Sequence, residues 1–260
     1  MKKILILSRR KLSVLAGLLG ALAILSVVNS PLILPTAGSD RQLPIYCVQR
    51  QQKICSISFD AAWGNEDTQQ LIDILARYNV KTTFFVVGDW AEKYPESVKA
   101  LSDAGHEIMN HSDTHAHYNT LSREQIQADL TACNEKIAAI TGSVPSLVRC
   151  PYGEYDDHVI SAIRELGMEP IQWDVDSLDW KELSAAEITK RVTERVQPGS
   201  IVLFHNAALH TPEALPGILE KLISQGYSVV PVSQLILGGT YNETYSIDHT
   251  GRQCPLEDAT

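Results

Sequence analysis

The sequence pattern predicts an α/β fold in which parallel strands form a barrel, and three observations lead to this prediction. Short apolar runs alternate with amphipathic helical segments, giving about seven β/α units. The short runs are apolar on both faces, which is typical of a parallel sheet covered by helices. The repeating part is roughly 200 residues long, which suits a barrel better than an open doubly wound sheet.

Each expected strand is an apolar run, and each expected helix carries apolar residues at helical spacing. The expected strands are residues 53–60, 81–87, 106–110, 146–150, 168–176, 200–205 and 227–232. The expected helices are residues 66–80, 89–105, 122–142, 156–167, 184–196 and 211–226. No Gly-x-Gly-x-x-Gly or Walker sequence follows the first strand, which weakens a nucleotide-binding version of this fold.

Local signals support several of these helices. Leu71 and Leu75 share one face of the first helix. Pro95 suits a first helical turn, where its missing N–H costs nothing. Ser122 and Gln125 have the spacing of a capping box. Gly142 is a typical helix stop.

The N-terminal segment, residues 1–29, predicts export. Basic residues precede an uncharged apolar run from Leu12 to Val28, as in a signal peptide or a short membrane anchor. No clear Ala-x-Ala cleavage site follows, so an anchor is favoured over a cleaved signal, and a buried core helix is the other alternative. The basic flank is expected to stay in the cytoplasm. The rest is then expected outside the cytoplasm, either membrane-anchored or secreted.

Composition sets the remaining boundaries and the partner class. Proline and glycine make residues 30–45 a predicted linker, followed by a folded domain at 46–240 and a tail at 241–260.

The formal net charge is −9, and the first 39 residues carry five basic side chains and no acid, so the remainder carries −14. This argues against a nucleic-acid partner, because phosphate contacts need clustered Lys and Arg.

Polar residues stand where the expected strands end. These residues are Asp60, His111, Arg149, the three acids Asp174, Asp176 and Asp179, and His205. In a parallel β/α barrel all strands end at one rim, and that rim carries the active site. The pattern therefore predicts one polar site built from distant parts of the chain.

Two pairs of residues at these strand ends indicate specific chemistry. His111 and His115 are four residues apart and can direct both imidazoles at one metal ion, although hydrogen-bonded histidines without a metal are the alternative. Asp60 and His205 suit a general base and a general acid around a water-attacked carbonyl. Sequence order places these two on opposite sides of the rim. The alternative for Asp60 is a carboxylate that only stabilises a turn. The alternative for His205 is a core histidine bonded to backbone.

Three further residue types support the site. Arg149 can pair an inner carboxylate and keep it ionised, or form a surface ion pair. Tyr152 follows a proline, so the stiff turn can present its backbone N–H to a developing oxyanion. Trp63 and Trp180 are candidates for stacking on sugar rings, or they fill the core.

Five ordered motifs within residues 52–237 carry a family resemblance: SFDAAW, HSDTH, RCPYG, DVDSLDW and LFH. The chain resembles the polysaccharide deacetylases of carbohydrate esterase family 4, whose common unit is the NodB homology domain. The resemblance implies a distorted (β/α)7 barrel and a divalent metal, usually zinc. It also implies hydrolysis of N-acetyl groups on peptidoglycan or chitin-like sugars.

The resemblance assigns a role to each matching position. His111 and His115 correspond to metal ligands, Asp60 to the general base, and Arg149 to the residue that orients it. The backbone N–H of Tyr152 corresponds to the oxyanion donor, His205 to the general acid tuned by Asp179, and Trp180 and Leu203 to walls of the acetyl pocket.

Three positions depart from the family pattern. Ala61 stands where family members usually carry a second acid that is the third metal ligand, so weaker metal binding is expected. Cys150 is a conceivable soft replacement ligand. Asn206 stands where aspartate is usual. Irregular first motifs occur in the sporulation-associated branch, which this chain also resembles.

The first interpretation is therefore a metal-assisted N-deacetylase of cell-wall glycan. Ala61 supports a second one, a catalytically weakened glycan-binding protein of the envelope. A third is an O-acetyl esterase acting on polysaccharide, because the same groups cleave esters.

Overall fold

The computed structural model describes residues 41–256. The predicted signal peptide or anchor at residues 1–29 and residues 30–40 of the predicted linker lie outside this range. Within the described range, no helix has the length and apolar character that crossing a membrane requires.

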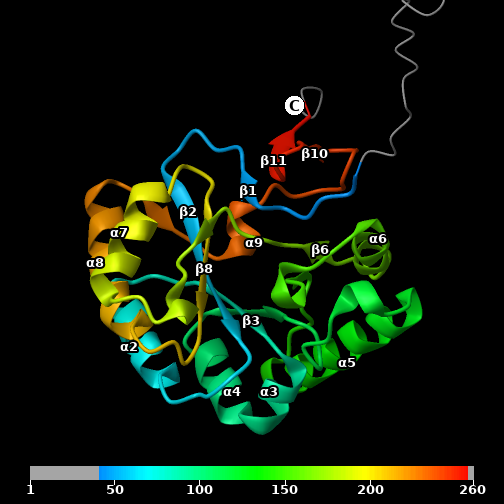
Figure 1. The fold of residues 1–260 in the computed structure, drawn as a ribbon, viewed down its shortest axis with the longest axis horizontal. Coiled ribbons are helices and arrows are strands. Elements are labelled where there is room, and N and C mark those ends of the chain that lie inside the picture. The colour runs from blue at the N-terminus through cyan, green and yellow to red at the C-terminus, as the bar shows by residue number, and fades with distance from the viewer. Residues whose placement is uncertain (1–40, 257–260) are drawn as a thin grey trace, which may run out of the picture. The chain divides into compact units, whose positions relative to one another are not determined.

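The centre of the fold is an all-parallel sheet with the order β6-β5-β4-β3-β2-β8-β7, and β9 also pairs with β2. Figure 1 shows this sheet curled, with helices on its outer side. The curled parallel sheet confirms the predicted α/β class. The strands are β2 Ile54–Ala61, β3 Thr83–Val86, β4 Glu107–Asn110, β5 Leu147–Val148, β6 Glu169–Pro170, β7 Val175–Asp176, β8 Ile201–His205 and β9 Ser228–Val229.

The sheet does not close by direct pairing of its edges. The single strand predicted at residues 168–176 is wrong, because it divides into β6 and β7 at opposite edges. Beside the edge strand β6 lies Ile45, a residue from the predicted linker. Its N–H donates to the carbonyl of Pro170, and its carbonyl accepts from the N–H of Gln172.

The helices follow the predicted pattern with one division. The helix predicted at residues 89–105 is two helices that meet at Tyr94, because Pro95 lacks an N–H and disfavours helical backbone before it. The capping box of Ser122 and Gln125 is present. The helices are α2 Thr68–Arg77, α3 Gly88–Lys93, α4 Pro95–Asp103, α5 Arg123–Thr141, α6 Asp157–Glu165, α7 Ala185–Arg195, α8 Thr211–Ser224 and α9 Val232–Leu235.

Alternation along β2 separates the apolar core from the site. Ile57 and Phe59 are fully buried in the apolar cluster between sheet and helices. Ser58 and Asp60 point to the other side of the sheet, where both bond to the buried guanidinium of Arg149. The strand thus buries apolar residues on one face and presents a carboxylate on the other.

Sequence reasoning missed a small second sheet. It has the order β1-β11-β10 and includes residues from the segment expected as a tail. Its strands are β1 Cys47–Val48, β10 Tyr245–Ile247 and β11 Arg252–Pro255. These strands are two to four residues long, too short for a clear hydrophobic alternation.

Candidate active site

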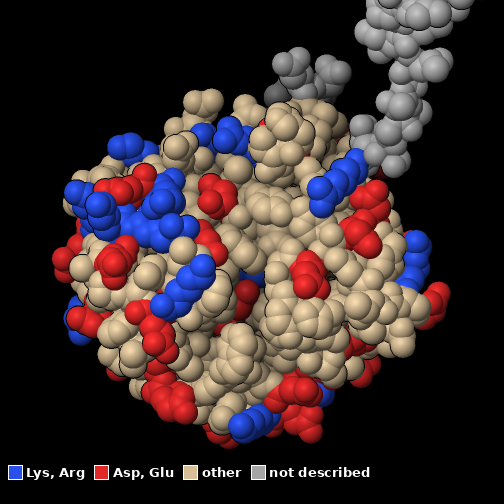
Figure 2. All heavy atoms as spheres, viewed as in Figure 1, with Lys and Arg blue, Asp and Glu red and all other residues tan. Residues whose placement is uncertain are grey.

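A cavity of about 780 Å³ opens at the carboxyl ends of the strands. Figure 2 shows the hollow near the middle of one face. Eight of the nine residues to which the family resemblance assigns a role line it: Asp60, His111, His115, Tyr152, Asp179, Trp180, Leu203 and His205. The ninth, Arg149, is fully buried and bonds to Asp60. The structure therefore brings these nine residues together, because parallel strands end at the same rim.

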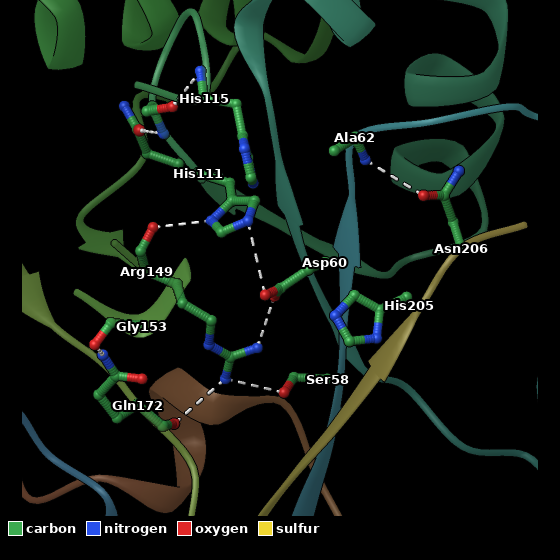
Figure 3. A network of polar contacts seen from close by, with 12 residues as sticks. Ser58, Asp60, Ala62, His111, His115, Arg149, Gly153, Gln172, His205 and Asn206 are labelled. Carbon is green, nitrogen blue, oxygen red and sulfur yellow. Dashed lines mark hydrogen bonds and ion pairs between the residues drawn. The ribbon is translucent and has the colours of Figure 1, made fainter. Parts of the chain in front are cut away.

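Arg149 fixes Asp60 from within the barrel (Figure 3). Its Nη1 donates to Asp60 Oδ1 at 2.7 Å, and its Nη2 donates to Ser58 Oγ at 2.9 Å. Its guanidinium also lies 4.1 Å from the ring centroid of Phe85. Burial alone would raise the pKa of Asp60. The charges of Arg149, His111 and His205 and the hydrogen bond from Arg149 outweigh that effect, so the pKa lies below its usual value.

His111 is held in one orientation by the backbone of the next motif. Its Nδ1 donates to the carbonyl oxygen of Arg149 at 2.8 Å, which leaves Nε2 as the atom nearest Asp60, 3.5 Å from Oδ2. Burial lowers the pKa of His111, so the neutral imidazole is favoured. A neutral imidazole whose other nitrogen bonds to a backbone carbonyl is the form that metals bind.

The loop that carries His115 is tied to its neighbours. Its backbone N–H donates to Ser112 Oγ at 2.8 Å, and its φ of 55° lies in the left-handed region. Asp129 on α5 accepts from the N–H of Asp113 at 2.8 Å and from the hydroxyl of Tyr118 at 2.7 Å. Sequence reasoning missed Asp129, because an acid in mid-helix carries no sign of what it faces.

The two imidazoles approach each other. The ring centroids of His111 and His115 are 5.0 Å apart. Burial and the neighbouring His111 lower the pKa of His115 to about 4. The neutral form of both rings is therefore favoured at pH 7, and both residues line the cavity.

His205 is positioned by Asp179. The Nδ1 of His205 lies 2.8 Å from Asp179 Oδ1, and its backbone N–H donates to Oδ2 at 2.8 Å. Thr211 Oγ1 also donates to Oδ2. Burial alone would lower the pKa of His205, but the hydrogen bond to Asp179 and its charge raise it above the ordinary value.

The predicted separation of Asp60 and His205 across the rim is wrong. They are register partners on β2 and β8, which are hydrogen-bonded neighbours. Sequence order misleads here because a late strand returns to pair with the first strand of the sheet.

Aromatic and apolar side chains form the cavity wall. The backbone of Tyr152 has a φ of 59°, and its exposed ring stacks on His117 with centroids 4.1 Å apart. Trp180 is also exposed, whereas Leu203 is buried and lines the cavity. The wall therefore combines a small buried apolar patch with aromatic rings at the mouth.

Comparison with known proteins agrees with this architecture. The polysaccharide deacetylase family profile matches residues 48–171. PdaA of Bacillus subtilis (strain 168), named a peptidoglycan-N-acetylmuramic acid deacetylase, is 31% identical over 195 residues, which are 74% of each protein. This chain belongs to the polysaccharide deacetylase family.

Other relatives of this polysaccharide deacetylase family member differ in length and in activity. PdaC of Bacillus subtilis, named likewise, is 34% identical, but the match spans 40% of PdaC and 72% of this chain. The structure of BA3943 from Bacillus anthracis, named a CE4 family pseudoenzyme, is 35% identical with a TM-score of 0.72, covering 74% of this chain and 68% of that one. The structure of the Bc1960 peptidoglycan N-acetylglucosamine deacetylase is 29% identical in sequence, with a TM-score of 0.71. The match covers 74% of this chain and 91% of that one.

The side chains expected to bind a metal are fewer than the three protein ligands that the family resemblance implies. His111 and His115 supply two imidazoles, but residues 41–256 contain no group of three or more His, Cys, Asp or Glu side chains that could hold a metal ion. Ala61 packs in the outer apolar cluster. Cys150 packs in a separate apolar cluster, and burial raises the pKa of its thiol to about 12, so it is not a replacement ligand. The residues fit a two-ligand site and do not form a three-ligand set.

Proposed function

We propose that this chain is a hydrolase that removes N-acetyl groups from a cell-wall glycan, either peptidoglycan or a chitin-like N-acetylhexosamine polymer. One observation carries the proposal. A carboxylate with a lowered pKa and an imidazole with a raised pKa are register partners at one cavity mouth. One group is ionised and the other is protonated at the same pH, as a base and an acid must be.

The proposed reaction uses these two groups in sequence. Asp60 accepts a proton from a water molecule, and the water oxygen forms a bond to the acetyl carbonyl carbon. The backbone N–H of Tyr152 stabilises the oxyanion that results. His205 then donates its proton to the glycan nitrogen as the C–N bond breaks, so acetate and a free amine leave.

The surrounding residues keep these groups in their working states. Arg149 holds Asp60 ionised and in place, and Asp179 orients His205 and favours its protonated form. Leu203 and Trp180 are proposed walls for the acetyl methyl group. His111 and His115 are the proposed ligands of a divalent metal, expected to be zinc. No step is assigned to the metal, because the donor set stops at two.

The location of the protein is a further part of the proposal. We assign residues 1–29 as a membrane anchor or signal, and residues 46–240 as the deacetylase domain. Relatives named as peptidoglycan deacetylases support a bacterial cell-envelope location. Cell fractionation of the full chain tests this, and recovery in the cytoplasmic fraction would contradict it.

Acetate release tests the activity. The full-length protein is expected to release acetate from N-acetylglucosamine oligomers or from peptidoglycan, and Asp60→Asn is expected to reduce the rate by at least about 100-fold. Asp73→Asn is the matched control, because Asp73 is exposed on α2. Full activity in Asp60→Asn would overturn the assignment of the base.

A second candidate is a glycan-binding protein with weakened catalysis. Ala61 and the two-imidazole donor set favour it, as does the 35% identity to a protein named as a pseudoenzyme. Metal content of the purified protein, measured beside acetate release and sugar binding, separates the two. Sugar binding without bound metal or acetate release would favour this second candidate, and release from O-acetylated glycan alone would indicate an esterase.

A further inference from the structure

Trp63 projects over the cavity between two groups of the proposed chemistry. Its ring centroid is 5.8 Å from that of His115 and 6.3 Å from that of His205. The side chain lines the cavity, yet 58% of the residue is exposed. A tryptophan left this open to water is unfavourable unless it covers a partner, because burying such a ring is strongly stabilising.

Other apolar side chains gather around the same opening. Seven large hydrophobic residues are exposed in the part of the chain that the structure describes, and four of them line this cavity. The four are Trp63, Tyr152, Trp180 and Leu209. Such a concentration of exposed apolar area at one cavity mouth marks a binding surface.

The loop that carries Trp63 is held by a buried amide. The N–H of Ala62 donates to Asn206 Oδ1 at 3.1 Å (Figure 3). Asn206 Nδ2 donates to the carbonyl of Trp63 at 3.0 Å and to that of Gly64. The indole N–H of Trp90 donates to the same two carbonyls. Two carbonyls and one N–H face Asn206, which fixes the orientation of its amide.

These contacts explain why asparagine, and not the aspartate usual in the family, stands at position 206. An aspartate there could accept from Ala62, but it has no N–H to donate, and its charge would face the carbonyl oxygens of Trp63 and Gly64. Asn206 is 4% exposed, so water cannot replace the lost donor readily. The asparagine therefore matches the conformation that places Trp63 over the cavity.

We propose that Trp63 binds the glycan by stacking on the apolar C–H face of a pyranose ring, and that Asn206 is the positioning residue that holds it there. The proposal rests on the proposed function, because it assigns a sugar contact within the same site. Trp63 would contact a sugar ring at the cavity mouth, while the acetyl group enters between Asp60 and His205.

Binding and kinetics on the full-length protein test the role of Trp63. Trp63→Ala is expected to raise the KM for N-acetylglucosamine oligomers and their Kd about tenfold, with kcat changed less than threefold. Trp63→Phe retains a stacking face and is expected to keep most of the affinity. Val144→Ala is the control, because Val144 is exposed away from the cavity. Values of KM and Kd within twofold of the parent protein for Trp63→Ala would overturn the proposal.

A double-mutant cycle tests the role of Asn206. Asn206→Asp is expected to raise Kd severalfold in the parent protein and to have little further effect in the Trp63→Ala background. Equal effects in both backgrounds would overturn the positioning role. The Kd is measured by calorimetry, which needs no turnover. If the parent protein releases no acetate but binds sugar in a Trp63-dependent way, the proposed activity fails while this inference stands.

Discussion

The side chain of Asp179 holds His205 through two contacts, one from the imidazole Nδ1 and one from the backbone N–H, each 2.8 Å long. The backbone contact fixes where the residue lies, and the ring contact fixes which nitrogen faces the cavity. Because Asp179 is 1% exposed, its charge acts on the imidazole with little screening by solvent. Position and protonation of the proposed acid thus depend on one carboxylate.

Replacing Asp179 by asparagine is expected to change the pH dependence of the reaction. The hydrogen bond and charge of Asp179 raise the pKa of His205, so their loss lowers that pKa. The protonated acid then disappears at a lower pH, and the alkaline limb of the kcat profile moves to lower pH. We expect kcat at pH 7 to fall about 100-fold. A profile of acetate release against pH checks this, and an unshifted alkaline limb would contradict it.

Removing Arg149 is expected to destabilise the fold. Arg149→Met leaves the carboxylate of Asp60 buried without its partner, which costs about 3–5 kcal/mol. Asp60→Asn in the same protein removes the unpaired charge, so the double variant is expected to recover part of this loss. Denaturant unfolding of the parent, both single variants and the double variant measures the coupling, and additive losses would argue against the pair.

The Asp60–Arg149 pair also predicts a pH dependence of stability. The folded pKa of Asp60 lies below its unfolded value, so its contribution is present above the unfolded pKa and is lost as pH falls through the folded pKa. The parent protein is expected to lose more stability than Asp60→Asn on acidification below about pH 4. Unfolding midpoints from pH 7 down to pH 3 test this, and parallel curves would refute it.

Introducing an acid at Ala61 is expected to couple stability to zinc. Ala61 is fully buried in an apolar cluster, so Ala61→Asp should lower the thermal midpoint of the metal-free protein, because a buried carboxylate is unfavourable. The family pattern places a metal ligand here, so zinc is expected to raise the midpoint of the variant more than that of the parent. Thermal unfolding with chelator or zinc measures both shifts. Equal zinc effects would show that the new acid is not a ligand.

Asp129 is expected to control the geometry of the His115 loop. Asp129→Ala leaves the N–H of Asp113 and the hydroxyl of Tyr118 without their acceptor, at a cost of about 1–3 kcal/mol. Zinc affinity is expected to fall about tenfold as the loop loosens. Glu135→Gln is the matched control, because Glu135 is exposed on the same helix. Calorimetric titration with zinc makes the comparison, and unchanged affinity would exclude this role.

Much of the architecture follows from local pattern. The helix around Leu71, the capping box at Ser122 and the stop at Gly142 were all predicted from the sequence and are present. The division of the 168–176 strand and the second sheet were not predicted. Their strands are very short, and they exist because other segments pair with them, so no periodicity within them reveals the pairing.

The amino-acid sequence alone was enough to predict the α/β class, the family and the residues that meet at the rim, because strand ends and motif order are local properties of the chain. That Asp60 and His205 are neighbours became clear only from the fold. The fold also places Asp129 behind the His115 loop and links Asn206 to Trp63. These relationships join residues 16 to 145 positions apart, and the physical reason is that strand pairing and burial, which act through space, select such partners.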